Sequence, residues 1–84
     1  MQVTAELSLY PLQDDYLPII QAFIDSLQGR EGITVVTNAM STQLCGEAQV
    51  VFDLVREALE ESERRWGRQV LVCKFIPREL EIAG

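Results

Sequence analysis

Two short segments gather hydroxyl and amide side chains where predicted strands end or begin. The first is Ser8-Leu9-Tyr10-Pro11, and the second is Thr37-Asn38-Ala39-Met40-Ser41-Thr42-Gln43-Leu44-Cys45-Gly46. A purely structural strand would carry continuous apolar or alternating residues at these places. Hydroxyls and amides donate and accept hydrogen bonds at neutral pH, but they are poor general bases. The segments therefore favour binding of a neutral polar ligand over acid–base catalysis.

The candidate ligand contacts are the polar and flexible side chains near these strand ends, namely Glu6, Ser8, Tyr10, Asn38, Met40, Ser41 and Thr42. Tyr10 adds an aromatic face to its hydroxyl. Glu6 is a carboxylate in mid-strand, with two interpretations: an ion-pair partner of Lys74, or an acceptor for an amino group or cation of a ligand. Met40 is a flexible filler of a core or an interface in most proteins, or else a ligand contact.

The residue types that are absent or scarce exclude several classes of site. The chain has no histidine, which removes the commonest general base, the Ser/His and Cys/His pairs and most catalytic zinc sites. Cys45 and Cys73 form no CxxC motif. The net charge is −6, from 13 acidic and 7 basic residues, which disfavours nucleic acid and mildly favours a cationic small ligand. We expect no catalytic residue, no metal and no cofactor.

The first half of the chain predicts a strand, a helix and a second strand. Residues 2–10 alternate apolar and polar side chains, as a half-buried strand does. Asp14 or Asp15 is the expected N-cap of a helix whose first turn holds Pro18 and which stops at Gly29. The β-branched run 33–37 predicts the second strand.

The second half predicts a tight turn at 38–39 and a strand over 40–45 that ends at Gly46. Apolar residues at helical spacing then predict a helix over 47–66, stopped by Gly67, with a solvated charged face. Residues 70–76 predict the fourth strand. The tail 78–84 has no periodicity, and we expect it to fray.

The order β-α-β-β-α-β predicts a ferredoxin-like α+β sandwich, with an antiparallel sheet and both helices on one face. We expect residues 1–84 to form one domain, with strand order 4-1-3-2. The first strand then separates Cys45 from Cys73 by more than a disulfide can span, so both should be free thiols.

One face of this sheet is left uncovered, and the outer strands place apolar residues on it, either Val36 or Leu71 and Phe75. Such a face is usually covered by another chain, so we expect a homodimer or homotetramer. No apolar run approaches the roughly 20 residues that span a bilayer. With no basic apolar leader pattern at residues 1–4, we expect a cytoplasmic protein without membrane insertion.

Four segments in order resemble the YkoF-like thiamine/hydroxymethylpyrimidine-binding family: Ser8-Leu9-Tyr10-Pro11, Asp14-Asp15-Tyr16, Ser41-Thr42 with Leu44 and Gly46, and Val51-Phe52-Asp53. The resemblance implies a ferredoxin-like domain that binds thiamine or its pyrimidine moiety and serves thiamine-precursor uptake or salvage without catalysis. It places polar ligand contacts on Ser8, Tyr10, Asn38, Ser41 and Thr42. Some members carry two such domains in tandem, so two copies of this chain would supply what the tandem supplies.

The leading hypothesis is therefore a non-enzymatic binding protein for thiamine or hydroxymethylpyrimidine. The alternative is a ferredoxin-like regulatory or assembly module whose ligand is another metabolite or a protein.

Overall fold

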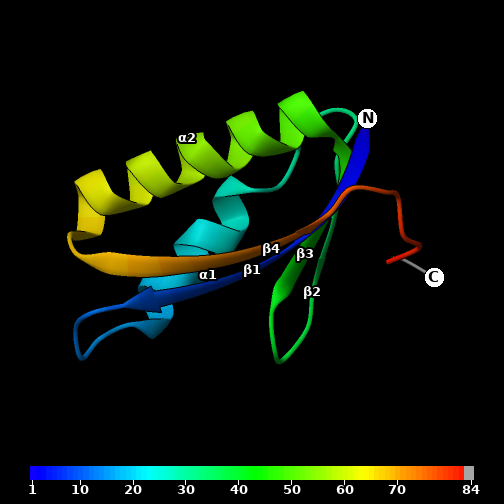
Figure 1. The fold of residues 1–84 in the computed structure, drawn as a ribbon. Helices are drawn as coiled ribbons and strands as arrows, with labels where there is room; N and C mark the ends of the chain where they lie inside the picture. Colours follow the sequence, from blue (N-terminus) through cyan, green and yellow to red (C-terminus); the bar gives the residue numbers. More distant parts are fainter. Residues whose placement is uncertain (83–84) are drawn as a thin grey trace.

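The computed structural model describes residues 1–82 and shows a four-stranded antiparallel sheet with two helices on one of its faces (Figure 1). The elements in chain order are β1 (Gln2–Pro11), α1 (Leu17–Ser26), β2 (Thr34–Thr37), β3 (Thr42–Glu47), α2 (Ala48–Trp66) and β4 (Gln69–Ile76). The strand order is β2-β3-β1-β4, which is the ferredoxin-like arrangement that the sequence predicted. Neither helix in this part of the chain is long and apolar enough to cross a membrane.

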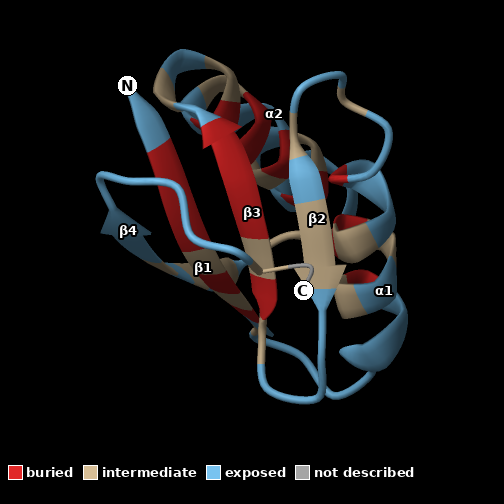
Figure 2. Cartoon of the chain, turned by 90° about the vertical axis from the view of Figure 1, so that its right-hand side faces the viewer, coloured by how far each residue is buried: buried red, intermediate tan, exposed pale blue. Residues whose placement is uncertain are grey.

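The core lies between the helices and the two central strands. The odd-numbered residues of β1, from Val3 to Leu9, are buried under the helices, as their alternation predicted. Figure 2 shows that buried residues gather on β1 and β3, the strands with a neighbour on each side. Leu7 and Leu44 are almost fully buried, and burial of each such side chain stabilises the fold by about 1.5–3 kcal/mol.

The first helix begins later and ends earlier than predicted. Its N-cap is Tyr16, which makes no side-chain cap bond, so the expectation of Asp14 or Asp15 was wrong. The preceding loop is held against the end of α2, because the Leu12 N–H donates to the Arg68 carbonyl (3.1 Å) and the Gln13 side chain donates to the Trp66 carbonyl. Pro18 does lie in the first turn.

At its C-terminal end α1 stops at Ser26, three residues before Gly29. Gly29 has φ of 85° and lies in the turn that follows the helix. Gly29 therefore provides the positive φ of the turn after the helix, and the helix itself ends before it. Gly67 caps α2 with φ of 95°, as predicted.

The sequence predicted that Gly46 ends the third strand, and this was wrong. Gly46 lies inside β3, opposite Val3. A Cβ at this position would lie 2.8 Å from the Gly32 carbonyl oxygen and 3.2 Å from Cγ1 of Ile33. Glycine is needed here because another backbone segment approaches the strand closely. The strand continues to Glu47, whose carboxylate accepts from the Gln49 and Val50 N–H groups and so starts α2 directly.

Of the apolar residues expected on the face of the sheet away from the helices, Val36 lies there, opposite Gln43, but Leu71 and Phe75 do not. Leu71 and Phe75 point toward the helices, and the Phe75 ring stacks on Phe52 of α2 with ring centroids 4.5 Å apart. Leu71 lies opposite the buried Leu9, so it shares that face. The residues of β4 on the open face are Val70, Val72, Lys74 and Ile76.

The segment after β4 crosses this open face (Figure 2). The Thr4 hydroxyl donates to the Arg78 carbonyl (3.0 Å) and accepts from the Leu80 N–H (2.9 Å). Thr4 and Cys45 are buried beneath it, although both point away from the helices. These contacts give residues 78–82 a definite course where the sequence predicted fraying, and the rest of that prediction, residues 83–84, lies outside the described part.

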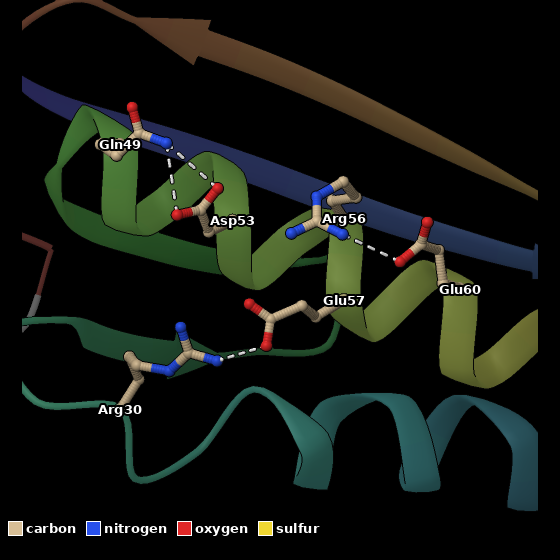
Figure 3. Close-up of polar contacts among 6 residues, drawn as sticks. All are labelled: Arg30, Gln49, Asp53, Arg56, Glu57 and Glu60. Atoms are coloured by element: carbon tan, nitrogen blue, oxygen red, sulfur yellow. Dashed lines mark hydrogen bonds and ion pairs between the residues drawn. The ribbon is translucent and has the colours of Figure 1, made fainter.

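The outer surface of α2 is the solvated charged face that its sequence predicted, and it carries several charge pairs (Figure 3). Arg56 and Glu60 form an i,i+4 pair at 3.0 Å, and Gln49 donates to Asp53 one turn apart. The Arg30–Glu57 pair, also at 3.0 Å, is tertiary and joins the loop after α1 to α2. Such exposed pairs contribute about 0–1 kcal/mol each. They orient the loop more than they stabilise the fold.

Replacement of Gly46 by alanine should lower the free energy of unfolding by about 1–3 kcal/mol, because the new methyl group would overlap the Gly32 carbonyl. Urea denaturation followed by circular dichroism measures this change. Gly29→Asn is the matched control: nothing lies within 4 Å of its Cβ position, and asparagine tolerates positive φ. Equal stability of the two variants would contradict the close-approach explanation.

Candidate ligand-binding pocket

A pocket of about 190 Å³ opens between α1, the C-terminal end of β1 and the β2–β3 loop. Its wall on the helix side is apolar and comes from Ile20, Phe23 and Ile24. Its other lining residues include six of the seven candidates from the sequence, namely Ser8, Tyr10, Asn38, Met40, Ser41 and Thr42. The fold thus brings together two polar segments that are about 30 residues apart in the chain.

The pocket exists because the two ladders of β1 differ in length. β1 pairs with β4 as far as Pro11, but its pairing with β3 stops at Leu7, opposite Thr42. Figure 1 shows β1 and β4 running together to one side while the β2–β3 hairpin turns away. Residues 8–10 of β1 consequently face the pocket along the edge that β3 leaves free.

The β2–β3 loop is held by Asn38. Its side-chain oxygen accepts from the Met40 N–H (2.8 Å) and the Ser41 N–H (3.1 Å), and its own N–H donates to the Ser41 carbonyl (3.0 Å). This Asx-type turn shapes the loop without a ligand. The amide nitrogen of Asn38 is then the part of the side chain that remains to donate to a ligand. Met40, at the tip of the loop, is 87% exposed.

Two threonine hydroxyls meet at the base of the loop. Thr37 and Thr42 lie opposite each other on the helix side of the sheet, with their Oγ1 atoms 3.0 Å apart. Only one hydrogen can lie between the two oxygens, so the pair keeps a second O–H that can turn toward the pocket. Thr37 was not among the candidates from the sequence, because its place in a strand does not by itself show that a second hydroxyl lies opposite it. A hydroxyl on each side of a hairpin turn is the signal that identifies such a pair.

Glu6 lies outside the pocket and contacts it through Ser41. The Ser41 hydroxyl donates to Oε2 of Glu6 (3.0 Å), while Nζ of Lys74 lies 3.6 Å from Oε1. The expected Glu6–Lys74 pairing is present, because the two residues are opposite each other in the β1–β4 ladder. Glu6 therefore holds Ser41 in place on the open side of the sheet.

The lining of the pocket contains no carboxylate, ammonium, guanidinium or thiol group. Within residues 1–82 no cluster of three or more His, Cys, Asp or Glu side chains could hold a metal ion. The two thiols are free, as predicted, and they lie on opposite faces of the sheet. Burial raises the pKa of the Cys73 thiol, which faces the helices away from the pocket lining.

Comparison with known proteins identifies one family. The model of the YKOF-related family matches residues 2–75, which is most of the chain. None of the curated proteins matches this sequence.

Several solved structures share the fold. A protein from Streptococcus pneumoniae is 26% identical, with a TM-score of 0.85 over 95% of this chain and 90% of that one. A hypothetical protein from Methanocaldococcus jannaschii is also 26% identical, with a TM-score of 0.80 over 95% and 84%. A Thermotoga maritima protein, provisionally assigned to thiamine biosynthesis or salvage, is 22% identical, with a TM-score of 0.85 over 98% and 91%.

Substitution of Asn38 by alanine removes the acceptor of two loop hydrogen bonds and should lower the free energy of unfolding by roughly 1–2 kcal/mol. Asn38→Asp keeps an oxygen at the same place and should retain most of that stability. Urea denaturation of both variants measures the difference. If alanine were as stable as aspartate, the loop would not depend on the side-chain oxygen.

Proposed function

The chain belongs to the YKOF-related family, and on that basis we propose that it binds thiamine or the hydroxymethylpyrimidine moiety of thiamine in the pocket beside α1. The observation that carries the proposal is the chemistry of the lining. An apolar wall faces a set of hydroxyl, amide and backbone groups that includes no ionised side chain. Such a site suits a flat, neutral, hydrogen-bonding ring.

The volume of the pocket favours one ring over a whole vitamin. Pockets that enclose a drug-sized ligand measure about 300–1,000 Å³, and this one has about 190 Å³. We place the aminopyrimidine ring inside, against Ile20, Phe23 and Ile24. Its two ring nitrogens accept hydrogen bonds and its amino group donates them, which the Thr37–Thr42 hydroxyls and the Asn38 amide nitrogen can satisfy.

The remainder of thiamine would then lie at the mouth. Tyr10 is 56% exposed there, and its ring can face the cationic thiazolium, a contact worth about 0.5–2 kcal/mol. The net charge of −6 also favours a cation. The provisional assignment of the Thermotoga maritima protein to thiamine biosynthesis or salvage points in the same direction. We propose a role in uptake or salvage of thiamine precursors in the cytoplasm, without catalysis.

We further propose that the protein acts as a homodimer or homotetramer. The open face of the sheet exposes Tyr10, Val70, Val72 and Ile76, and within residues 1–82 the tail is bonded to this face at Thr4. A second copy would cover the rest. Multi-angle light scattering at several concentrations tests this proposal, and a monomer at all of them would contradict it.

The alternative is a regulatory or assembly module with the same fold and another ligand. A panel of small metabolites tested for thermal stabilisation separates the two, since a ligand at 100 times its dissociation constant stabilises a protein by about 2.7 kcal/mol. Stabilisation by an unrelated metabolite, with none by thiamine or hydroxymethylpyrimidine, would favour the alternative.

Isothermal titration should show saturable binding of thiamine or hydroxymethylpyrimidine, with about one ligand per chain. The Ser41→Ala/Thr42→Val double variant should weaken binding roughly 10–100-fold, because it removes two hydroxyls from the lining and leaves ligand groups unpaired.

The matched control is Ser62→Ala/Thr34→Val, which removes the same two hydroxyl types away from the pocket. The buried Ser62 hydroxyl has no hydrogen-bond partner in the structure, so its loss should cost little stability. Equal affinity of the pocket variant and the control would refute the assignment of the site.

A further inference from the structure

The backbone of Leu9 offers a donor and an acceptor side by side at the edge of the pocket. The directions follow from the ladders. The Leu12 N–H donates to Arg68, next to β4, and the Met1 carbonyl accepts from Ala48, next to β3. Backbone groups alternate in direction along a strand, so even-numbered residues of β1 turn toward β4 and odd-numbered residues turn toward β3. Leu9 therefore directs both its N–H and its C=O to the β3 side.

No strand residue meets Leu9 on that side. Leu7 is paired with Thr42, and there the ladder stops. In the same register the loop residue opposite Leu9 would be Met40, and its N–H donates instead to the Asn38 side chain (2.8 Å). Among residues 1–82 no hydrogen bond reaches the Leu9 N–H or C=O from the loop. Leu9 itself lines the pocket and is only 9% exposed.

We propose that Leu9 reads the ligand: its C=O accepts from an exocyclic amino group and its N–H donates to the adjacent ring nitrogen. The ligand class is then a flat nitrogen heterocycle with an amino group next to a ring nitrogen, bound in the plane of the sheet as the next rung of the ladder. An amide side chain makes the same paired contact with the amino and ring nitrogens of adenine. This inference rests on the proposed function and specifies which edge of the pyrimidine is recognised.

The surroundings of Leu9 agree with a ring in this plane. Ile20, Phe23 and Ile24 stand on the helix side, where one face of the ring would pack against them. Ser8 and Tyr10 point to the other face of the sheet, so they approach the ring from the open side.

The first test compares thiamine with its 4-oxo analogue by isothermal titration. In the analogue a carbonyl replaces the amino group and the ring nitrogen beside it carries hydrogen, so donor and acceptor are exchanged. The ring N–H of the analogue would then face the Leu9 N–H, and its carbonyl would face the Leu9 C=O, so neither hydrogen bond could form. The analogue should bind roughly 10–100-fold more weakly. Equal affinity of the two compounds would overturn the inference.

The second test replaces one backbone N–H by oxygen in the full-length chain made by chemical synthesis. An ester in place of the Leu9 amide should weaken thiamine binding about tenfold or more. An ester in place of the Leu71 amide is the matched control: Leu71 lies opposite Leu9, and its N–H points to the free outer edge of β4. The ester at Leu71 removes a backbone N–H from an outer edge of the same sheet, outside the pocket. Thiamine affinity should therefore stay unchanged.

Amide nuclear magnetic resonance gives a readout that needs no variant. Saturating thiamine should slow hydrogen exchange of the Leu9 amide, while the Leu7 amide, already paired with Thr42, should keep its rate. If thiamine binds but neither the Leu9 exchange rate nor the analogue affinity changes, only the edge contact is wrong. If neither thiamine nor hydroxymethylpyrimidine binds, the proposed function fails and this inference fails with it.

Discussion

The unequal pairing of β1 is the constraint on which the candidate site depends. β1 has ten residues and pairs with β4 up to its last residue, Pro11, but β3 has six and leaves β1 after Leu7. A longer β3 would fill the gap with backbone, and a shorter β1 would remove its free edge. The pocket therefore lies where the next residue pair of the β1–β3 ladder would otherwise form, with α1 behind it. Such a place offers hydrogen-bonding groups that are already oriented, and they need no ionised side chain to support them.

Local hydrogen bonds shape this gap without any ligand. Asn38 closes the β2–β3 loop on itself, and Glu6 holds Ser41 from the other face of the sheet. The Asn38 contact engages the Met40 N–H, which would otherwise be the loop donor in register with Leu9. A site whose loop is already shaped loses less conformational entropy when a ligand binds. The side chains that looked like ligand contacts in the sequence thus divide into two groups: some face the pocket, and others hold those that do.

Strand β4 and the open face of the sheet are organised by apolar burial. The apolar residues of β4 divide between the helices, where Phe75 stacks on Phe52, and the open face. Within residues 1–82, the two hydrogen bonds of Thr4 hold the tail against one end of that face. The opposite end, around Tyr10 and Val70, lies beside the pocket mouth and stays exposed. In the proposed dimer or tetramer, a second copy that covered this end of the face would also lie beside the pocket mouth.

The sequence by itself determined the element order, the buried face of β1 and the gathering of hydroxyls near strand ends, because period-2 and helical patterns follow from which side chains must leave water. It misplaced Gly46, Leu71 and the N-cap of α1, since these depend on the Gly32 backbone, on strand register and on the loop beside Trp66. Only the tertiary structure decided that the Leu9 backbone has no partner strand on the β3 side, because β3 leaves β1 after Leu7. Side-chain patterns do not record where a neighbouring strand ends, and backbone groups are the same at every residue.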